Sequence, residues 1–248
     1  MIEARNLSLT FGDNLVLDNV SFVFELGKTN LIIGQSGSGK TVLMKCLVGL
    51  LEPDEGEVIY DGRNFCTMGI YERRKLQQEI GMLFQGGALF DSLSVEQNVM
   101  FPLNMFTKQN LSEKTDRVNF CLERVNLEGR NKLMPSELSG GMIKRVAIAR
   151  AISLNPKYLF CDEPNSGLDP ITSGVIDALI KEITEEYNIT TVVNTHDMNS
   201  VLMTGENIAF IHKGKIWWSG NRHEILHTDN EILNDFIFAT ELTRRLKR

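Results

Sequence analysis

Apolar and polar residues alternate along the first fifth of the chain, with the period of strands that bury one face. Short polar turns, GDN at residues 12–14 and ELGK at residues 25–28, separate the alternating segments. This pattern predicts an antiparallel sheet at the N-terminus. The alternating apolar positions are Leu7, Leu9, Phe11, Leu15, Leu17, Val20, Phe22 and Phe24.

Continuous apolar runs take over further along the chain. NLIIG and IGMLFQ are runs of this kind, typical of strands that are buried on both faces. YLFCDEP, TTVVNTHD and NIAFIHKGKIWWSG follow later, and the helical pattern of SGVIDALIKEITEEYN separates the first two. TVLMKCLVGLLEP is predicted to be a helix that Pro53 ends. Strands that alternate with helices predict an α/β protein with a parallel sheet.

Residues 86–155 have a different character and are predicted to form a helical insertion. SEKTDRVNFCLERVNL has apolar residues at helical spacing from Val118 to Val125, and Ser112 is placed to cap this helix. GGMIKRVAIARAISLN is predicted to be a second helix, closed by Pro156.

The last segment, residues 230–248, is predicted to be helical with a basic end. Two interpretations stay open: a tail that packs on a neighbouring subunit, or an amphipathic helix that covers its own core. The basic residues at this end are Arg244, Arg245, Lys247 and Arg248.

Composition narrows the class of protein. At 248 residues the chain can form one large α/β domain or two modest ones, and its 42% apolar and 23% charged residues are ordinary for a globular protein. A net charge of −6 argues against a nucleic-acid partner, because neutralising phosphates requires a basic face.

Neither metal-ligand spacing nor membrane spans are visible in the sequence. The four cysteines are scattered without a C-x-x-C pair, and we interpret them as reduced thiols of a cytoplasmic protein. The N-terminus lacks an apolar secretory core, and no stretch approaches the roughly 18 apolar residues of a membrane span. If this protein serves a membrane, it is expected to dock onto another chain that enters it.

One segment has the pattern of a phosphate-binding loop, G-x-x-x-x-G-K-[ST], between a buried strand and a helix. Its glycines let backbone N–H groups turn inward around a phosphate, its lysine reaches the terminal oxygens and its threonine hydroxyl can bind Mg²⁺. The alternative, a glycine-rich turn without chemistry, does not explain the flanking elements. The predicted nucleotide-binding residues are Gly34, Gln35, Ser36, Gly37, Ser38, Gly39, Lys40 and Thr41.

Two acidic residues follow the buried strand of YLFCDEP, at the end where parallel sheets bind ligands. Asp162 is placed to hold Mg²⁺ through its water shell, and Glu163 is placed to polarise an attacking water. Alone, such a pair fits a solvated turn as well; beside the phosphate loop, it predicts a nucleotide hydrolase.

A second anion-binding feature lies about a hundred residues after the loop. In ELSGGM, a serine and two glycines open a helix, and a helix start offers unpaired N–H groups with about half a positive charge. Ser139, Gly140 and Gly141 are therefore candidate phosphate ligands, although a serine that only caps the helix gives the same pattern.

Six motifs occur in one order: GQSGSGKT, LFQ, LSGGM, LFCDEP, SGLD and NTHD. In this order and spacing the chain resembles the nucleotide-binding subunits of ATP-binding-cassette (ABC) transporters. The resemblance implies an ABC ATPase, that is, a P-loop NTPase core with an N-terminal antiparallel β subdomain and an inserted α-helical subdomain. The implied boundaries are 1–86 with 155–225 for the core, 87–154 for the helical subdomain and 226–248 for a C-terminal helical tail.

The resemblance also explains the second anion-binding feature. In such proteins the LSGGM segment, with Ser139, Gly140 and Gly141, faces the γ-phosphate held by a partner's phosphate loop, in a head-to-tail dimer that encloses two ATP molecules. Asp169, in SGLD, would cross the dimer interface and link the two sites. The implied ligands are ATP and Mg²⁺.

Three further roles follow from the resemblance. Gln85 would contact the Mg²⁺ and the attacking water, and His196 would hold the γ-phosphate and orient that water. Phe11 would stack on adenine, although its alternation with Leu7 and Leu9 fits a core residue almost equally well.

One substitution in the signature motif points to a subfamily. Met142 stands where most ABC proteins have Gln, and MLFQGGALFDSLSVEQNVMFPL and DEPNSGLDPIT resemble the Mla-type ATPases of mammalian-cell-entry (MCE) phospholipid transporters. This resemblance implies a second copy of the chain, an integral-membrane permease and an MCE lipid-binding protein as partners, and leaves room for a small regulatory subunit. The protein would sit on the cytoplasmic face of the inner membrane through the permease.

Other ATPases stay open as alternatives. A cassette for lipoprotein release or cell division is also a single domain on a membrane partner. A small-molecule kinase of the P-loop class would have no use for LSGGM, and a non-transport cassette protein usually has two phosphate loops in one chain.

Overall fold

The computed structural model describes residues 1–238, which belong to two compact units. One unit combines Met1–Gly69 with the described residues 190–238, and the other is Ile70–Ile189. The predicted helical insertion, residues 87–154, lies inside the second unit. The four basic residues predicted at the end of the C-terminal helix lie outside the described residues.

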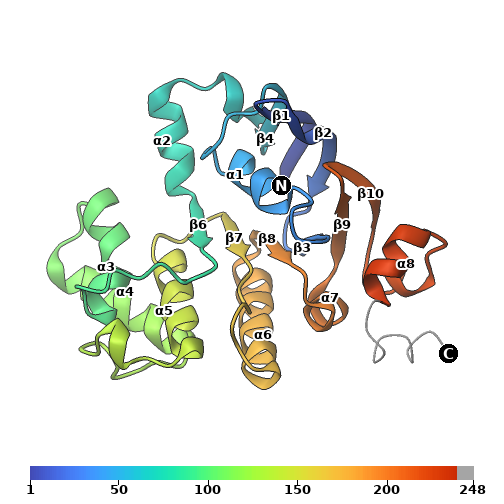
Figure 1. Ribbon diagram of the computed structural model, residues 1–248. Helices are drawn as coiled ribbons and strands as arrows, with labels where there is room; N and C mark the ends of the chain where they lie inside the picture. The colour runs from blue at the N-terminus through green and yellow to red at the C-terminus, as the bar shows by residue number, and fades with distance from the viewer. Residues whose placement is uncertain (239–248) are drawn as a thin grey trace. The chain divides into compact units, whose positions relative to one another are not determined.

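An antiparallel sheet begins the first unit, as predicted (Figure 1). Leu7, Leu17 and Val20 are fully buried on its inner face. Successive side chains of a strand point to opposite faces, so burial of one face produces the alternation of apolar and polar residues seen in the sequence. The strands follow the order β2-β1-β4-β5, with bounds β1 (Ile2–Phe11), β2 (Asn14–Phe24), β4 (Glu55–Tyr60) and β5 (Arg63–Asn64).

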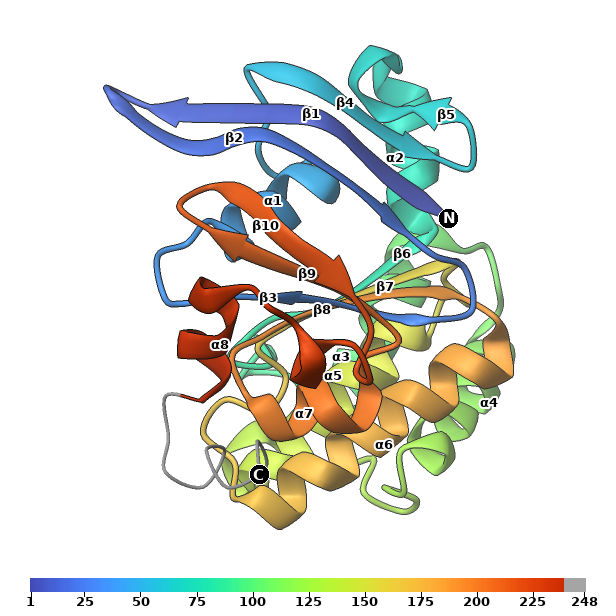
Figure 2. The ribbon, with the colours of Figure 1, turned by 90° about the vertical axis from the view of Figure 1, so that its right-hand side faces the viewer.

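Four more strands of this unit lie in the order β10-β9-β3-β8 (Figure 2). β3 pairs in parallel with both β8 and β9, and β10 forms a hairpin with β9. All five residues of β3 are buried, which explains its continuous apolar run. The bounds are β3 (Thr29–Ile33), β8 (Thr190–Thr195), β9 (Asn207–His212) and β10 (Lys215–Gly220).

The first helix is shorter than predicted. α1 spans Lys40–Leu47, and Val48 is its C-cap, so Pro53 does not end it. Gly49 follows with φ +76°, the left-handed conformation that commonly ends a helix. A Cβ at Gly49 would lie 2.3 Å from the Phe65 ring, which leaves no room for another residue.

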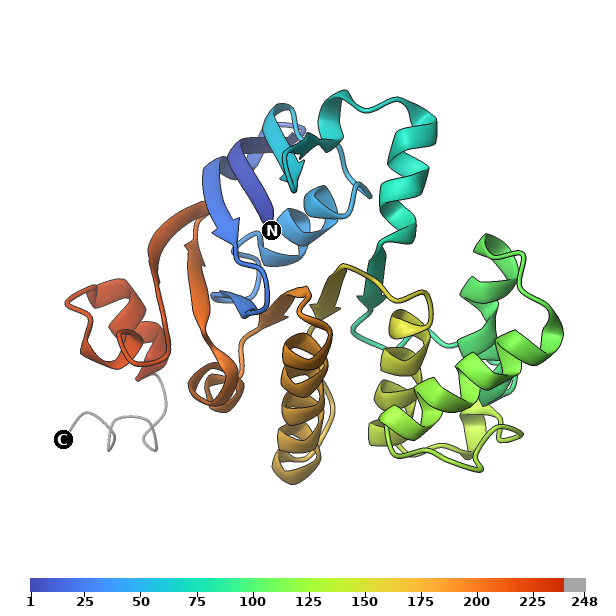
Figure 3. The same cartoon turned by 180° about the vertical axis from the view of Figure 1, so that it is seen from behind.

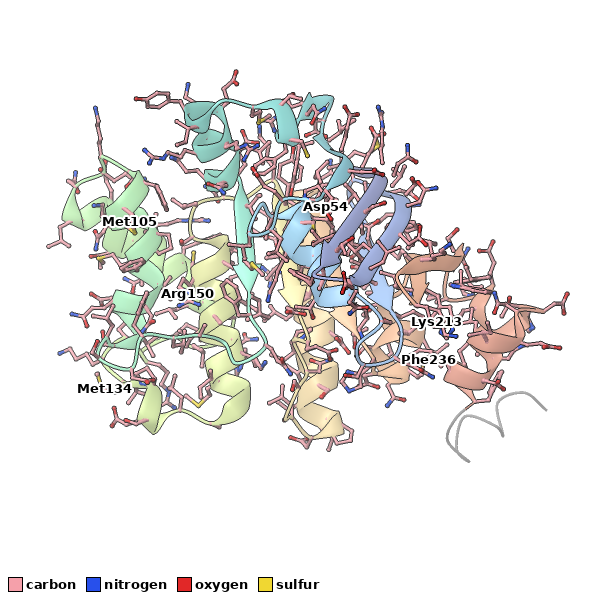
Figure 4. All side chains as sticks on the ribbon, turned by 45° about the horizontal axis from the view of Figure 1, so that its top comes forward. Asp54, Met105, Met134, Arg150, Lys213 and Phe236 are labelled. Atoms are coloured by element: carbon pink, nitrogen blue, oxygen red, sulfur yellow. The ribbon has the colours of Figure 1, made fainter. Side chains whose placement is uncertain are left out.

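The last described helix, α8 (Glu231–Ile237), packs on its own unit. Leu233 and Ile237 are buried. The centroid of the Phe236 ring, labelled in Figure 4, lies 5.4 Å from the centroid of the Phe210 ring of β9. The described part of the tail therefore covers the core of its own unit. The remaining helices of this unit are η1 (Phe65–Thr67), α7 (Met198–Thr204) and η3 (Ile225–His227).

The second unit combines a parallel strand pair with helices. α3, α4 and α5 lie side by side in a helical cluster, in agreement with the predicted insertion (Figure 3). Its elements are α2 (Ile70–Gln78), β6 (Ile80–Leu83), α3 (Val95–Phe106), α4 (Leu111–Arg124), η2 (Pro135–Glu137), α5 (Gly140–Ile152), β7 (Tyr158–Asp162) and α6 (Pro170–Tyr187).

The predicted cap of α4 was wrong by two residues. Asn110, not Ser112, precedes the helix: its Oδ1 accepts from the N–H of Glu113 at 3.0 Å, and the Glu113 carboxylate accepts from the N–H of Asn110 at 2.7 Å. This reciprocal capping box satisfies two N–H groups that the helix cannot pair. Ser112 is exposed in the first turn.

The cysteines have no disulfide partners, as predicted. Cys46, Cys121 and Cys161 are buried, and burial raises the pKa of the Cys46 and Cys121 thiols to about 11. These thiols therefore stay protonated and unreactive near neutral pH. None of the helices within residues 1–238 combines the length and apolar character that a membrane span requires.

The capping box gives a direct test of the corrected helix start. Asn110→Ala should lower the free energy of unfolding by about 1 kcal/mol, because the side-chain cap of the Glu113 N–H is lost. Ser112→Ala, the matched control, should change it by less than about 0.5 kcal/mol. Urea unfolding followed by circular dichroism measures both, and equal losses would contradict the assignment.

Candidate functional site

The predicted phosphate loop connects β3 to α1 in the first unit. Gly34 and Gly39 have φ values of +149° and +108°. A Cβ on Gly34 would lie 2.3 Å from the carbonyl oxygen of Ile211, and a Cβ on Gly39 would lie 3.0 Å from that of Val16. Both positions therefore require glycine for conformation and for space.

The lysine of the loop is buried and turned onto the loop's own backbone. Lys40 is 7% exposed, and its Nζ donates to the carbonyl oxygens of Gly34 at 2.8 Å and Gln35 at 3.0 Å. The N–H of Ser38 donates to the Gln35 carbonyl at 3.2 Å, which tightens the loop. The first turn of α1 has no acidic residue, and the Lys40 ammonium group lies at the same loop. Together the helix N-terminus and the ammonium group form a site for an anion.

Parallel pairing brings His196 to the same edge of the sheet. β3 and β8 pair with Ile33 opposite Thr195, so Gly34 and His196 are the first residues after the two strands. His196 is exposed, and the turn behind it is fixed because the N–H of Asp197 donates to Thr195 Oγ1 at 3.0 Å. The predicted neighbourhood of His196 and the phosphate loop is therefore consistent with the strand register.

Phe11 does not belong to the core. Leu7 and Leu9 are 0% and 5% exposed, but Phe11 is 49% exposed at the hairpin end of β1. The pairing of β1 with β2 shifts register between Leu9 and Thr10, and this irregularity breaks the alternation of faces. An exposed ring at this position is available for stacking on a flat ligand.

In the second unit, the two predicted acidic residues end β7. Asp162 is the last residue of the strand, and Glu163 follows with φ +49°, a left-handed conformation that is unfavourable for a residue with a Cβ. The N–H of Ser166 donates to the Glu163 carbonyl at 3.1 Å and closes a turn over residues 163–166, which we call the acidic turn. Strained backbone of this kind is concentrated at functional sites.

Gln85 lies near the same turn. It follows β6, which pairs in parallel with β7 so that Leu83 lies opposite Cys161. The Nε2 of Gln85 donates to Ser166 Oγ at 3.3 Å. Gln85 and the acidic turn therefore follow the carboxyl ends of two neighbouring parallel strands, at the same edge of the pair.

The start of α5 is built as the sequence predicts. Ser139 is the N-cap, and its Oγ accepts from the N–H of Met142 at 3.3 Å, so its capping role is real. A Cβ on Gly141 would lie 2.6 Å from Cγ2 of Thr172, and one on Gly140 would lie 3.3 Å from the Leu168 side chain. The two glycines therefore let Leu168, before α6, and Thr172, in its first turn, approach closely.

Asp169 caps α6. Its Oδ1 accepts from the N–H groups of Ile171 and Thr172, each at 3.0 Å, and its Oδ2 accepts from the Thr172 hydroxyl at 2.5 Å. The Thr172 hydroxyl, followed by these N–H groups, lowers the pKa of the exposed Asp169 carboxyl. Asp169 is thus held as an anion at a helix start.

The predicted residues therefore form two groups. The first unit holds Phe11, the Gly34–Thr41 loop and His196, and the second holds Gln85, Asp162, Glu163, Ser139, Gly140, Gly141 and Asp169. Within residues 1–238, no set of three His, Cys, Asp or Glu side chains could hold a metal ion by itself.

Sequence reasoning missed Lys144. This lysine of α5 is 4% exposed, and burial lowers the pKa of its ammonium group, while Cys161, Glu163 and Asp162 act in the opposite direction. A charged residue within a helix whose other residues are largely apolar was the available signal, since a buried lysine requires polar partners.

Comparison with known proteins identifies related chains. Residues 17–166 match the family described as ABC transporter. The intermembrane phospholipid transport system ATP-binding protein MlaF of Haemophilus influenzae is 41% identical over 93% of this chain and 87% of its own length. A protein of Mycobacterium leprae named "Probable ribonucleotide transport ATP-binding protein mkl" is 35% identical over 95% of this chain and 68% of its own length.

A solved structure with the same fold is a dimer. It is the post-hydrolysis state of an ATP-binding cassette bound to ADP and Pi, with a TM-score of 0.81 and 32% identity. The similarity covers 90% of this chain and 99% of that chain. The predicted fold, a mixed α/β cassette with an antiparallel sheet and a helical region, is confirmed.

The phosphate loop can be tested through its tightest glycine. Gly34→Ala should reduce kcat/KM for ATP hydrolysis about a hundredfold, because the new methyl group displaces the loop from Ile211 and a displacement near 1 Å has this effect. Gly174→Ala is the control, since nothing lies within 4 Å of a Cβ there. Steady-state ATPase assays measure both variants, and normal activity of Gly34→Ala would exclude this loop as the nucleotide site.

Proposed function

Because this chain belongs to the ABC transporter family, as an ATP-hydrolysing subunit, we propose that it works as a head-to-tail dimer that powers phospholipid transport between bacterial membranes. The proposal has three parts: the composition of the ATP site, the roles of the residues around it, and the cargo. The single observation that supports it best is similarity along 93% of the chain to a phospholipid-transport ATPase.

Each ATP would be held by two chains. One chain contributes the Gly34–Thr41 loop, and the partner contributes the start of α5. Two observations support this arrangement: the chain has two separate anion-binding features, and a similar cassette has been solved as a dimer with ADP and Pi. Ser139 and the N–H groups of Gly140 and Gly141 would contact the terminal phosphate of the partner's nucleotide.

Hydrolysis would proceed by positioning and charge stabilisation, with little covalent participation of the protein. Lys40 would leave its loop carbonyls to neutralise the β- and γ-phosphate oxygens. Glu163 would accept a proton from the attacking water, and His196 would orient that water against the γ-phosphate. Asp169, rigid at the start of α6, would cross to the partner, and the exposed Phe11 ring would stack on adenine.

Mg²⁺ would be held by few protein ligands. The donors proposed for it are the Thr41 hydroxyl, the Gln85 amide oxygen and the Asp162 carboxylate, and oxygen donors of this kind suit Mg²⁺. The absence of a self-sufficient cluster within residues 1–238 fits a cation that takes most ligands from phosphate and water. When bound, Mg²⁺ supplies charge neutralisation at the phosphates.

The proposed partners follow from the cargo. An integral-membrane permease would anchor the chain on the cytoplasmic face of the inner membrane, and an MCE-domain protein would carry lipid beyond it, with room for a small regulatory subunit. Met142 in the signature motif and the DPIT run support the Mla-type assignment. A ribonucleotide cargo is the competitor, because a similar chain is named for it.

Two inactive variants can test the two-chain site. Lys40→Ala and Ser139→Arg should each abolish ATP hydrolysis, yet mixing them should restore activity. In the mixed dimer both defects fall in one site, and the other site pairs an intact loop with an intact α5 start. The readout is ATPase activity after the chains are mixed and allowed to exchange.

A matched mixture controls for unspecific rescue. Lys40→Ala mixed with Glu163→Gln should stay inactive, because one defect then falls in each site. Normal hydrolysis by Ser139→Arg alone would refute the shared site.

Affinity capture tests the cargo. The tagged chain, isolated from detergent-solubilised membranes of its native host, should bring down a multi-span permease and an MCE-domain protein with co-purified phospholipid. Mass spectrometry of proteins and extracted lipids is the measurement, with an untagged strain as control. A permease recovered with neither an MCE protein nor enriched phospholipid would contradict the lipid assignment.

A further inference from the structure

Lys144, on α5, contacts the backbone of two segments: the one that follows β6, at Gln85, and the acidic turn that follows β7, at Glu163. Its Nζ donates to the carbonyl oxygen of Gln85 and lies 3.5 Å from that of Glu163. At 4% exposure the ammonium group has little access to water, so these carbonyls replace its hydration. An ammonium group has three N–H donors and can hold two backbone carbonyls at once.

These contacts complete a closed circuit of hydrogen bonds. Gln85 donates through Nε2 to Ser166 Oγ, and the N–H of Ser166 donates to the Glu163 carbonyl. Lys144 then joins the Glu163 carbonyl back to the Gln85 carbonyl. Among its members, only Lys144 comes from a helix, so it ties the ends of β6 and β7 to α5.

A second cation of α5 holds the same loop further along. Arg150, labelled in Figure 4, donates to the carbonyl oxygens of Gly87 at 2.8 Å and Ala88 at 2.7 Å. Ala88 has φ +46°, an unfavourable conformation for a non-glycine residue. The segment from Gln85 to Ala88 is therefore fixed to α5 at both ends.

We propose that Lys144 is a positioning residue for hydrolysis: it fixes the backbone of Gln85 and Glu163 in its own chain and so directs the Glu163 carboxylate. The inference rests on the proposed function, in which Glu163 activates the attacking water. Because φ at Glu163 is +49°, an unfavourable conformation for a residue with a Cβ, loss of a contact to its carbonyl should let this backbone relax and so change the direction of the side chain. Lys144 donates to the backbone carbonyl of Glu163 and not to its carboxylate.

This role separates Lys144 from Ser139, although both belong to α5. Ser139 would contact the partner's nucleotide. Lys144 lies about 7.5 Å further along the helix axis and holds the acidic turn of its own chain. The two residues should therefore fail in different ways. Loss of Ser139 should impair closure of the dimer, and loss of Lys144 should impair the chemical step after closure.

The test is steady-state and dimer analysis of Lys144→Met in the full chain. Lys144→Met should lower kcat about a hundredfold, because the turn loses its anchor, with KM for ATP within about twofold. The closed dimer should accumulate in ATP on size-exclusion chromatography, as expected for Glu163→Gln. Lys144→Arg, which keeps the charge and the donors, should recover most of kcat.

Arg145→Met is the matched control. Arg145 is the next residue of α5 and also donates to backbone carbonyls, of Asn126 at 3.1 Å and Val125 at 3.4 Å, but these lie in the turn after α4. A merely structural role for Lys144 predicts equal effects of the two substitutions. Circular dichroism checks folding, and Lys144→Gln provides a second variant if Lys144→Met does not fold.

Three results would overturn the inference. These are an unchanged kcat in Lys144→Met, a rise in KM with loss of the closed dimer as in Ser139→Arg, or equal losses in Arg145→Met. Failure of the shared-site proposal is distinguishable, because Ser139→Arg would then hydrolyse ATP normally while the kcat comparison between Lys144→Met and Arg145→Met keeps its meaning.

Discussion

Parallel strand pairing is the constraint on which both groups of predicted site residues depend. In the first unit, Ile33 pairs with Thr195, so the phosphate loop and His196 leave the same edge of the sheet. In the second, Leu83 pairs with Cys161, so the Gln85 segment and the acidic turn also leave one edge. Parallel strands present all their carboxyl ends on one side, and residues distant in sequence meet there without any contact being specified separately.

Backbone conformation then decides what those edges can bind. At Gly34 the absence of a Cβ makes the loop possible, since the Ile211 carbonyl occupies the space a side chain would need. At Glu163 the left-handed φ is adopted despite a Cβ, a cost of about 1–2 kcal/mol that neighbouring contacts must offset. The hydrogen bonds of Ser166 and Lys144 to the Glu163 carbonyl are contacts of this kind.

The sequence predicted the elements whose signals are local. The buried strands and the glycine spacing of the phosphate loop were visible because continuous apolar runs and Gly-x-x-x-x-Gly-Lys depend on neighbours in the chain. The end of α1 at Gly49 and the cap at Asn110 were not, because each required a choice between equally suitable turn residues. For Phe11 the apolar alternation fitted a core residue and the family resemblance favoured stacking on adenine; its exposure depends on a register shift between two strands. Helix α2 was missed because only Leu76 is buried in it, which leaves no apolar period.

Lys144 shows why long-range contacts escape a reading of the sequence. Nothing near it in the chain indicates that its partners are the carbonyls of Gln85 and Glu163, 59 and 19 residues away. Only the folded helix brings its side chain to both. An α-helix is stiff along its axis, so if a partner's nucleotide displaced α5 at Ser139, as the proposed dimer implies, Lys144 would move as well. In the proposed dimer, the helix that would complete the partner's site would thereby also act on the backbone behind Glu163, and closure of one site would change the geometry of the other.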